Sequence, residues 1–217
     1  MSNKLWKKVW ENNQIDFHQS HTNSLLQDYW SVLALPFDAH VFVPLCGKSQ
    51  DMQWLLSQNC HVMGVELSAI AVAAFFAENQ LIPHKTRHGK LIRWQCDKIT
   101  IYCGDFFDLK QQDLLGIVAV YDRAALLALS PAVRKRYVRH MQHILPQACP
   151  TLLLTTEYPD AHAIDTHWVI DTEITALYET AYSIELVHGE QGFETHPGYG
   201  HSVTERTEEK VYLLRAH

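Results

Sequence analysis

From His40 onward, short apolar runs alternate along the chain with stretches of helical periodicity, and this alternation is the feature that most limits the possible folds. Continuous apolar runs are typical of strands that are buried on both faces of a parallel sheet. A helical stretch between two such strands makes a βαβ unit. The sequence therefore predicts an α/β fold built around a parallel sheet.

Individual elements follow from the same pattern. Strands are expected over residues 41–44, 61–66, 117–121 and 151–157, a hairpin or short strand at 91–94 and 100–103, and helices over 49–58, 68–79 and 132–144. Ser68 is placed to cap its helix and Pro131 to open the last one. Residues 183–188 and 210–215 predict a hairpin-like return at the sheet edge, through a connection containing Gly189, Gly192, Gly198 and Gly200.

The N-terminal part differs from the rest in having only helical periodicity. Two helices are expected within residues 1–35, the second capped near Thr22 or Asn23, with the turn Asp16-Phe17-His18 between them. A length of 217 residues and 47% hydrophobic content suffice for a single core. We expect one domain over 1–217, with a helical cover (1–35) on an α/β core (40–217).

Charge and cysteine usage exclude several classes of protein. The formal charge is -6, and basic residues gather only at Arg134-Lys135-Arg136, which argues against nucleic acid as a partner. The N-terminus is polar and no run approaches the roughly 18 apolar residues of a membrane span, so a cytoplasmic protein is expected. A monomer is expected as well. Five cysteines without a CxxC pair indicate reduced thiols, and no metal is expected, since Cys60 and His61 would point to opposite faces of a strand.

The segment Pro44-Leu45-Cys46-Gly47-Lys48-Ser49 follows the first strand. Gly47 permits a sharp turn, and Ser49 begins a helix whose free amides attract negative charge. The segment is not a P-loop, because Phe42 occupies the position of the required first glycine, and the GxGxxG fingerprint is absent. Alone, it is as consistent with an ordinary strand-to-helix turn as with a ligand loop.

Glu66 ends the next strand, about twenty residues downstream, where nucleoside-binding βαβ units place a carboxylate for the ribose hydroxyls. The structural alternative is an acid that merely flanks the cap Ser68. Loop and acid together favour a nucleoside cofactor, either NAD or S-adenosylmethionine. The missing pyrophosphate fingerprint disfavours NAD.

Three further features lie where a ligand would be in such a sheet. Asp105 and Phe106 follow a strand and could contact an adenine, or they could be a turn acid and a core aromatic. Arg123, after Asp122, would set a guanidinium in the crevice, where it suits a carboxylate or anion; a surface Asp122–Arg123 pair is the weaker interpretation. Trp10, on the opening helix, could cover a sulfonium cation.

At these residues the sequence resembles the bacterial branch of the thiopurine S-methyltransferase family. The resemblance covers Trp6, Trp10, Ile15 to His18, Val43 to Met52, Gly64 to Ser68, Gly104 to Phe107 and Tyr121 to Leu126. It implies a class I methyltransferase (Rossmann-like) fold with seven strands, mostly parallel with an antiparallel last strand, helices on both faces and an N-terminal helical lid. It implies S-adenosylmethionine as the cofactor. The expected cofactor-binding residues are Trp10, Leu45, Gly47, Glu66, Leu67, Asp105, Phe106 and Arg123.

The resemblance also implies an activity, because members of the family methylate aromatic and heterocyclic thiols, and bacterial relatives are linked to detoxification of selenium and tellurium oxyanions. The glycine, two prolines and phenylalanine that usually follow the fifth strand are replaced here by Glu157 to Trp168, which suits a more polar acceptor, and Asp16 stands where glycine is typical. Direct methyl transfer needs alignment more than a base. The candidates on the acceptor side are Asp16, His18 and Arg123.

Two alternatives stand beside this function: a non-catalytic protein that senses S-adenosylmethionine, and an NAD-dependent oxidoreductase. Cys46 is expected to be a small buried residue near the cofactor rather than a nucleophile.

Overall fold

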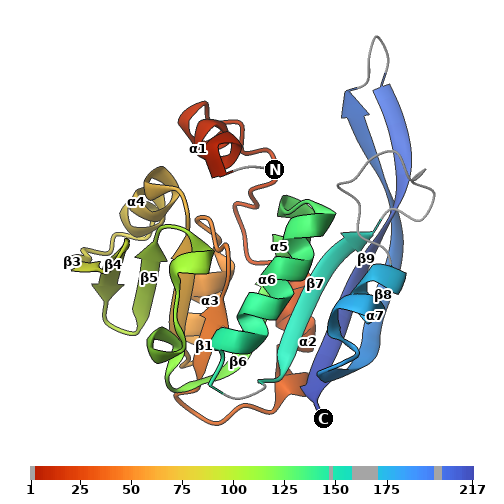
Figure 1. The fold of residues 1–217 in the computed structure, drawn as a ribbon. Helices are drawn as coiled ribbons and strands as arrows, with labels where there is room; N and C mark the ends of the chain where they lie inside the picture. Colours follow the sequence, from red (N-terminus) through yellow and green to blue (C-terminus); the bar gives the residue numbers. More distant parts are fainter. Residues whose placement is uncertain (1–2, 147–148, 158–170, 198–201) are drawn as a thin grey trace.

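The computed structural model describes residues 3–146, 149–157, 171–197 and 202–217, which form one mixed sheet with helices on both faces (Figure 1). The strands of this part of the chain are β1 (His40–Val43), β2 (His61–Glu66), β3 (His84–His88), β4 (Leu91–Cys96), β5 (Ile99–Cys103), β6 (Ile117–Arg123), β7 (Thr151–Glu157), β8 (Tyr182–Pro197) and β9 (Ser202–Ala216). The helices are α1 (Asn3–Glu11), α2 (Ser24–Tyr29), η1 (Trp30–Leu33), α3 (Asp51–Ser57), α4 (Ala69–Glu78), η2 (Phe106–Asp108), η3 (Gln111–Leu114), α5 (Ala125–Ala128), α6 (Pro131–Ile144) and α7 (Asp171–Tyr178).

The strand order of the sheet is β3-β4-β5-β2-β1-β6-β7-β9-β8. The five strands from β5 to β7 are parallel, and β9 runs antiparallel to β7. This confirms the mostly parallel sheet with an antiparallel last strand. The expected count of seven strands is wrong for the described ranges, because the antiparallel strands β3 and β4 extend the sheet beyond β5.

Two groups of buried side chains cover the two faces of the sheet. Within β1, Phe42 belongs to one group and its neighbours Val41 and Val43 to the other, as the alternation of a strand requires. The first group includes residues of α6 and α7, and the second includes residues of α2, α3 and α4. Helices therefore lie on both faces, as expected.

Three helices, α2, α4 and α6, start where the sequence predicts them, whereas α3 begins at Asp51 rather than at Ser49. Asn23 caps α2 by accepting a hydrogen bond from the amide of Leu26, and Ser68 caps α4 by accepting one from Ala71, each at 3.3 Å. Pro131 stands in the first turn of α6, where its missing N–H costs nothing. Asn23, Ser68 and Pro131 thus mark the first turns of α2, α4 and α6.

Two details differ from expectation. β3 was not predicted, because the exposed edge strand His84–His88 is polar on both faces and has no apolar alternation. Gly189 and Gly192 lie inside β8, paired with Lys210 and Thr207, rather than in its connection to β9; Gly198 and Gly200 lie outside the described residues.

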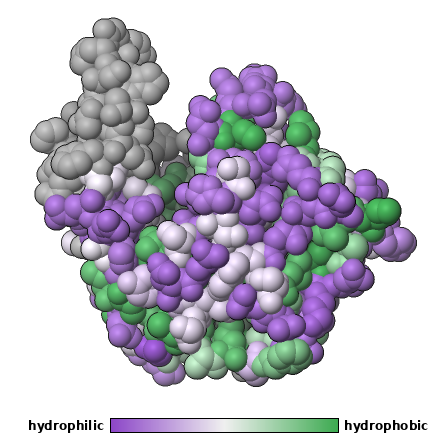
Figure 2. Space-filling view, turned by 180° about the vertical axis from the view of Figure 1, so that it is seen from behind, coloured by the Kyte–Doolittle hydropathy of each residue, from purple (hydrophilic) through white to green (hydrophobic). Residues whose placement is uncertain are grey.

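The basic segment at residues 134–136 lies on α6 and is only partly exposed. Arg134 is fully buried and donates to the Leu126 carbonyl and to Glu173, each at 2.7 Å, so it does not belong to a basic surface. On the face seen in Figure 2, hydrophilic and hydrophobic residues are intermixed. No helix of the described residues combines the length and the apolar character needed to cross a membrane.

The sheet also determines where a ligand can bind. From β1 the chain proceeds to β2 on one side, while β6 pairs with β1 on the other side. The order of connections reverses at this point, and ligands of open α/β sheets bind in the crevice outside the carboxyl ends of such strands. The carboxyl ends of β1 and β6 are therefore the place to look for a site.

Candidate functional site

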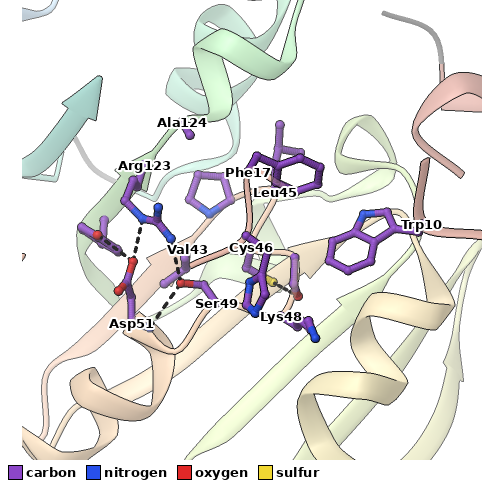
Figure 3. A pocket seen from close by; sticks show the side chains of 14 residues that line it. Trp10, Phe17, Val43, Leu45, Cys46, Lys48, Ser49, Asp51, Arg123 and Ala124 are labelled. Atoms are coloured by element: carbon purple, nitrogen blue, oxygen red, sulfur yellow. Dashed lines mark hydrogen bonds and ion pairs between the residues drawn. The ribbon is translucent and has the colours of Figure 1, made fainter. Parts of the chain in front are cut away.

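A pocket opens at the carboxyl ends of β1 and β6 (Figure 3). Its lining comes from α1, from the turn after α1, from the β1–α3 loop and from the end of β6: Trp10, Phe17, His18, residues 43–49, Asp51, Tyr121, Arg123 and Ala124. Segments far apart in the sequence thus meet at one place. Trp10 and Arg123 lie on opposite sides of the pocket in this view.

The β1–α3 loop is held in an unusual backbone conformation. Leu45 and Gly47 both have left-handed φ angles, 47° and 54°, and the next pocket residue after β6, Ala124, has a φ of 61°. A residue with a side chain pays roughly 1–2 kcal/mol for this conformation. Such strain at the rim of a pocket is typical of functional sites, where it sets backbone groups toward a ligand.

Glu66 connects the end of β2 to this loop. Its carboxylate accepts hydrogen bonds from the amides of Gly47, at 2.9 Å, and Ser68, at 2.6 Å. Burial raises the pKa of Glu66, while the amides of Ser68, Gly47 and Leu67 act in the opposite direction. Glu66 itself is not among the pocket-lining residues, and neither is the half-buried Leu67 beside it.

Trp10 is buried and lies against the loop from the α1 side. A Cβ built on Gly47 would be 3.4 Å from the Trp10 ring, so the indole packs directly on this glycine. The ring makes an edge contact with Phe17 at 5.9 Å between centroids, and Trp6 makes a second at 5.5 Å. Trp6 also donates to the Ala128 carbonyl at 3.0 Å, which ties α1 to α5.

Arg123 enters the pocket already bonded to the protein. Its Nε donates to Asp51 at 2.7 Å, and its terminal nitrogens donate to Gln19 and Ser49, each at 3.2 Å. Burial opposes the guanidinium charge, but the Asp51 carboxylate and Tyr121 outweigh it, and the pKa of Arg123 is raised.

The interpretation of Asp122 and Arg123 as a pair is wrong. Asp122 is buried and accepts from the Tyr137 hydroxyl at 2.6 Å, and burial raises its pKa to about 6. Neighbouring residues of a strand point to opposite faces, so only Arg123 faces the pocket. Its carboxylate partner, Asp51, was not predicted, although an acid in the first turn of the helix after the loop is the signal that could have found it.

The turn after α1 brings His18 into the pocket, and the His18 backbone amide donates to the Ile15 carbonyl at 2.8 Å. Burial, followed by the charges of Lys48 and Arg123, lowers the pKa of His18. The imidazole is therefore neutral at pH 7. Asp16 is exposed and does not line the pocket.

Asp105 and Phe106 also lie outside the pocket lining. The Asp105 carboxylate caps η2 by accepting from the Phe107 amide at 3.0 Å, and it accepts from the Asn3 side chain of α1. Phe106 is buried in the core against Phe42. A contact of either residue with adenine stays a prediction.

Cys46 is a buried thiol, and burial together with Glu66 raises its pKa well above the usual value. It stays protonated and is a poor nucleophile. Gly64 is required beside it, because a Cβ at that position would be 2.7 Å from the Cys46 sulfur. Among the described residues, no group of three or more His, Cys, Asp or Glu side chains could hold a metal ion.

Comparisons with known proteins point to one family. The Thiopurine S-methyltransferase (TPMT) family matches residues 1–217. The thiopurine S-methyltransferase of Stutzerimonas stutzeri (strain A1501) is 44% identical over 98% of this chain and 90% of its own length. That of Pseudomonas fluorescens (strain Pf0-1) is 41% identical over 99% of both chains.

Solved structures agree in fold at low sequence identity. A SAM-dependent methyltransferase from Anabaena variabilis ATCC 29413 superimposes with a TM-score of 0.61 at 14% identity, over 98% of this chain and 95% of that one. Phosphoethanolamine N-methyltransferase 2 of Haemonchus contortus, solved with S-adenosyl-L-methionine, gives a TM-score of 0.57 at 9% identity, over 75% and 38%. The chain therefore belongs to the thiopurine S-methyltransferase family, and it is an S-adenosylmethionine-dependent methyltransferase.

Proposed function

We propose that this enzyme methylates the sulfur of aromatic or heterocyclic thiols in the pocket between Trp10 and Arg123. The observation that carries the proposal is the strained β1–α3 loop, whose Gly47 amide is bonded to the buried Glu66 carboxylate beside a pocket walled by aromatic rings. Relatives named thiopurine S-methyltransferase, 40–44% identical, support a thiol acceptor.

The residues present fit S-adenosylmethionine. The Glu66 carboxylate has lone pairs beyond those used by the two amides and can accept from ribose hydroxyls. Leu45 and Gly47 line the pocket, and the Arg123 guanidinium suits the carboxylate of the methionine moiety. Leu67, Asp105 and Phe106 are the candidates for the adenine side. When bound, the cofactor supplies an activated methyl group on a sulfonium ion.

The protein's own contribution is alignment and exclusion of water. The Trp10 indole closes one side of the pocket and offers a ring face or edge to a cation. Phe17 is 52% exposed although it lines the pocket, so an aromatic acceptor can pack against it.

Proton transfer is needed only for a thiol that arrives protonated. The neutral His18 imidazole in the pocket can accept such a proton. The exposed Asp16 lies outside the lining, which makes His18 the better candidate of the two. Arg123 is fully charged and would stabilise an anion rather than remove a proton.

Incubation with methyl-labelled S-adenosylmethionine and a panel of aromatic thiols, selenite and tellurite tests the proposal. Labelled S-methyl product from the aromatic thiols is expected. Product from selenite or tellurite alone would move the function to metalloid detoxification. Binding of the cofactor without methylated product from any acceptor would favour a sensor instead.

A further inference from the structure

Asp51 is a fully buried carboxylate at the start of α3, on the floor of the pocket. One of its oxygens accepts from the backbone amide of Asn23 at 2.8 Å. The other accepts from the Tyr121 hydroxyl at 2.9 Å and from the Nε of Arg123 at 2.7 Å (Figure 3). The carboxylate thus joins three elements that are distant in sequence.

The first consequence concerns the direction of the Arg123 guanidinium. Three of its N–H groups donate to Asp51, Gln19 and Ser49, one from each nitrogen. A guanidinium has five N–H groups. Each terminal nitrogen carries one more N–H than its bond to Gln19 or Ser49 uses, and these groups can donate to a ligand in the pocket.

The second consequence concerns the turn between α1 and α2. The hydrogen bond that the Asn23 amide donates to Asp51 fixes the end of this segment. The Gln19 side chain accepts from both Arg123, at 3.2 Å, and the Asn23 side chain, at 3.3 Å. The same segment carries Phe17 and His18 into the pocket. The position of the turn and the orientation of the guanidinium thus depend on one buried carboxylate.

We propose that Asp51 is a positioning residue for methyl transfer, which orients the Arg123 guanidinium toward the carboxylate of the cofactor. This role does not require Asp51 to touch a ligand. The proposal rests on the placement of Arg123 at the cofactor under the proposed function.

A double-mutant cycle on cofactor affinity tests this role. The dissociation constant of S-adenosylhomocysteine is measured by calorimetry for the wild type, Asp51→Asn, Arg123→Met and the double variant. Each single variant is expected to bind about tenfold more weakly or worse, because breaking a buried charge pair leaves its partner misplaced. The double variant is expected to bind no more weakly than Arg123→Met, because Asp51 acts through Arg123.

Two further variants separate positioning from general damage to the fold. Asp122→Asn removes a neighbouring buried carboxylate that faces away from the pocket, and its affinity is expected to stay within about twofold of the wild type. Asp51→Glu keeps the charge but displaces it by one methylene, so it should fold and weaken binding less than Asp51→Asn. If Asp51→Asn does not fold, the same cycle is run with Asp51→Glu.

The outcomes are distinguishable. Losses that multiply in the double variant would overturn the inference, since Asp51 would then act independently of Arg123. A weakened Arg123→Met beside an unchanged Asp51→Asn would overturn the inference and leave the proposed function standing. An unchanged Arg123→Met would overturn the placement of Arg123 at the cofactor and, with it, the inference.

Discussion

His18 shows at the residue scale how the pocket can select among thiols. Its lowered pKa keeps the imidazole neutral to lower pH than an exposed histidine. A neutral imidazole is needed to accept a proton, so activity with a weakly acidic thiol should fall as the pH drops through this lowered pKa.

His18→Gln is predicted to slow methylation of a weakly acidic thiol by about 10²-fold and to remove this acid limb. An acidic aromatic thiol, which arrives ionised, should be methylated at nearly the rate of the wild type. The rates of the wild type and the variant, measured as a function of pH with each of the two acceptors, check this prediction. Equal losses with both acceptors would mean that His18 does not act as a base.

Gly64 and Cys46 form a second pair of residues that the structure couples. Gly64→Ala is predicted to lower the free energy of unfolding by about 1–3 kcal/mol, because the new Cβ would meet the Cys46 sulfur at 2.7 Å. Cys46→Ala removes that sulfur, so the double variant should be more stable than the sum of the single effects predicts. Urea unfolding of the three variants measures this, and strict additivity would rule out the contact as the cause.

At the residue scale, the sequence predicts those site residues that are marked by their place at a turn or at the end of a strand. Gly47 in a turn and Glu66 at a strand end follow from their places along the chain, and Arg123 from the end of its strand. Asp51 was missed because its partner Arg123 is 72 residues away, and only tertiary packing brings the two together. Asp105 and Phe106 follow their strand as predicted but lie outside the pocket lining, because tertiary packing, which the sequence pattern does not reveal, decides which residues face the pocket.

At the scale of elements, the role of α1 as a lid over the site stays a prediction, which its contacts make testable. The helix contributes Trp10 to the pocket and is tied to α5 by the bond from Trp6 to the Ala128 carbonyl. Trp6→Phe keeps the aromatic packing and removes that bond. We predict faster hydrogen exchange in α1 and about fivefold weaker binding of S-adenosylhomocysteine, the equivalent of one lost hydrogen bond of about 1 kcal/mol.

Lys8→Ala, an exposed change on the same helix, is the matched control and should alter neither quantity. Exchange rates measured with and without S-adenosylhomocysteine decide the matter. If Trp6→Phe exchanges like the wild type in both states, α1 is not held by this bond.

Buried elements could be predicted from the sequence, while peripheral ones could not. β2 and β7 have the expected bounds because their apolar runs are continuous. β3 escaped prediction because an edge strand needs no buried face. The length of the β8–β9 hairpin was underestimated because the sequence of its outer half, in residues 189–197 and 202–210, contains few apolar residues.

At the scale of the whole molecule, one buried acid adds a pH dependence to stability. Burial raises the pKa of Asp122 to about 6 from its usual 3.8, so the folded state binds more protons than the unfolded state between these values. The free energy of unfolding should therefore fall as the pH rises through this window, by about 3 kcal/mol in all. Asp122→Asn should lack this loss.

Urea unfolding of both proteins at about pH 4 and about pH 7 measures the difference. The wild type is expected to lose stability relative to Asp122→Asn on going to the higher pH. If the difference in the free energy of unfolding between the two proteins is the same at both pH values, the pKa of Asp122 is not raised in the folded state.

The arrangement of the whole sheet came from the family resemblance rather than from residue patterns. Periodicity identifies strands but does not order them, and the order β2-β1-β6 is what creates the crevice. The resemblance supplied the antiparallel last strand but gave two strands too few for the described residues, because β3 and β4 extend the sheet beyond β5.

The central claim is that the loop after β1 and the carboxylate of Glu66 together hold S-adenosylmethionine. The most direct measurement is calorimetric titration of the wild type and Glu66→Ala with S-adenosylhomocysteine, and of the wild type with NADH. The wild type should bind S-adenosylhomocysteine at micromolar scale and NADH not at all, and Glu66→Ala should bind at least tenfold more weakly through lost charge-assisted hydrogen bonds. Equal affinity of the two proteins for S-adenosylhomocysteine, or binding of NADH in its place, would contradict the claim.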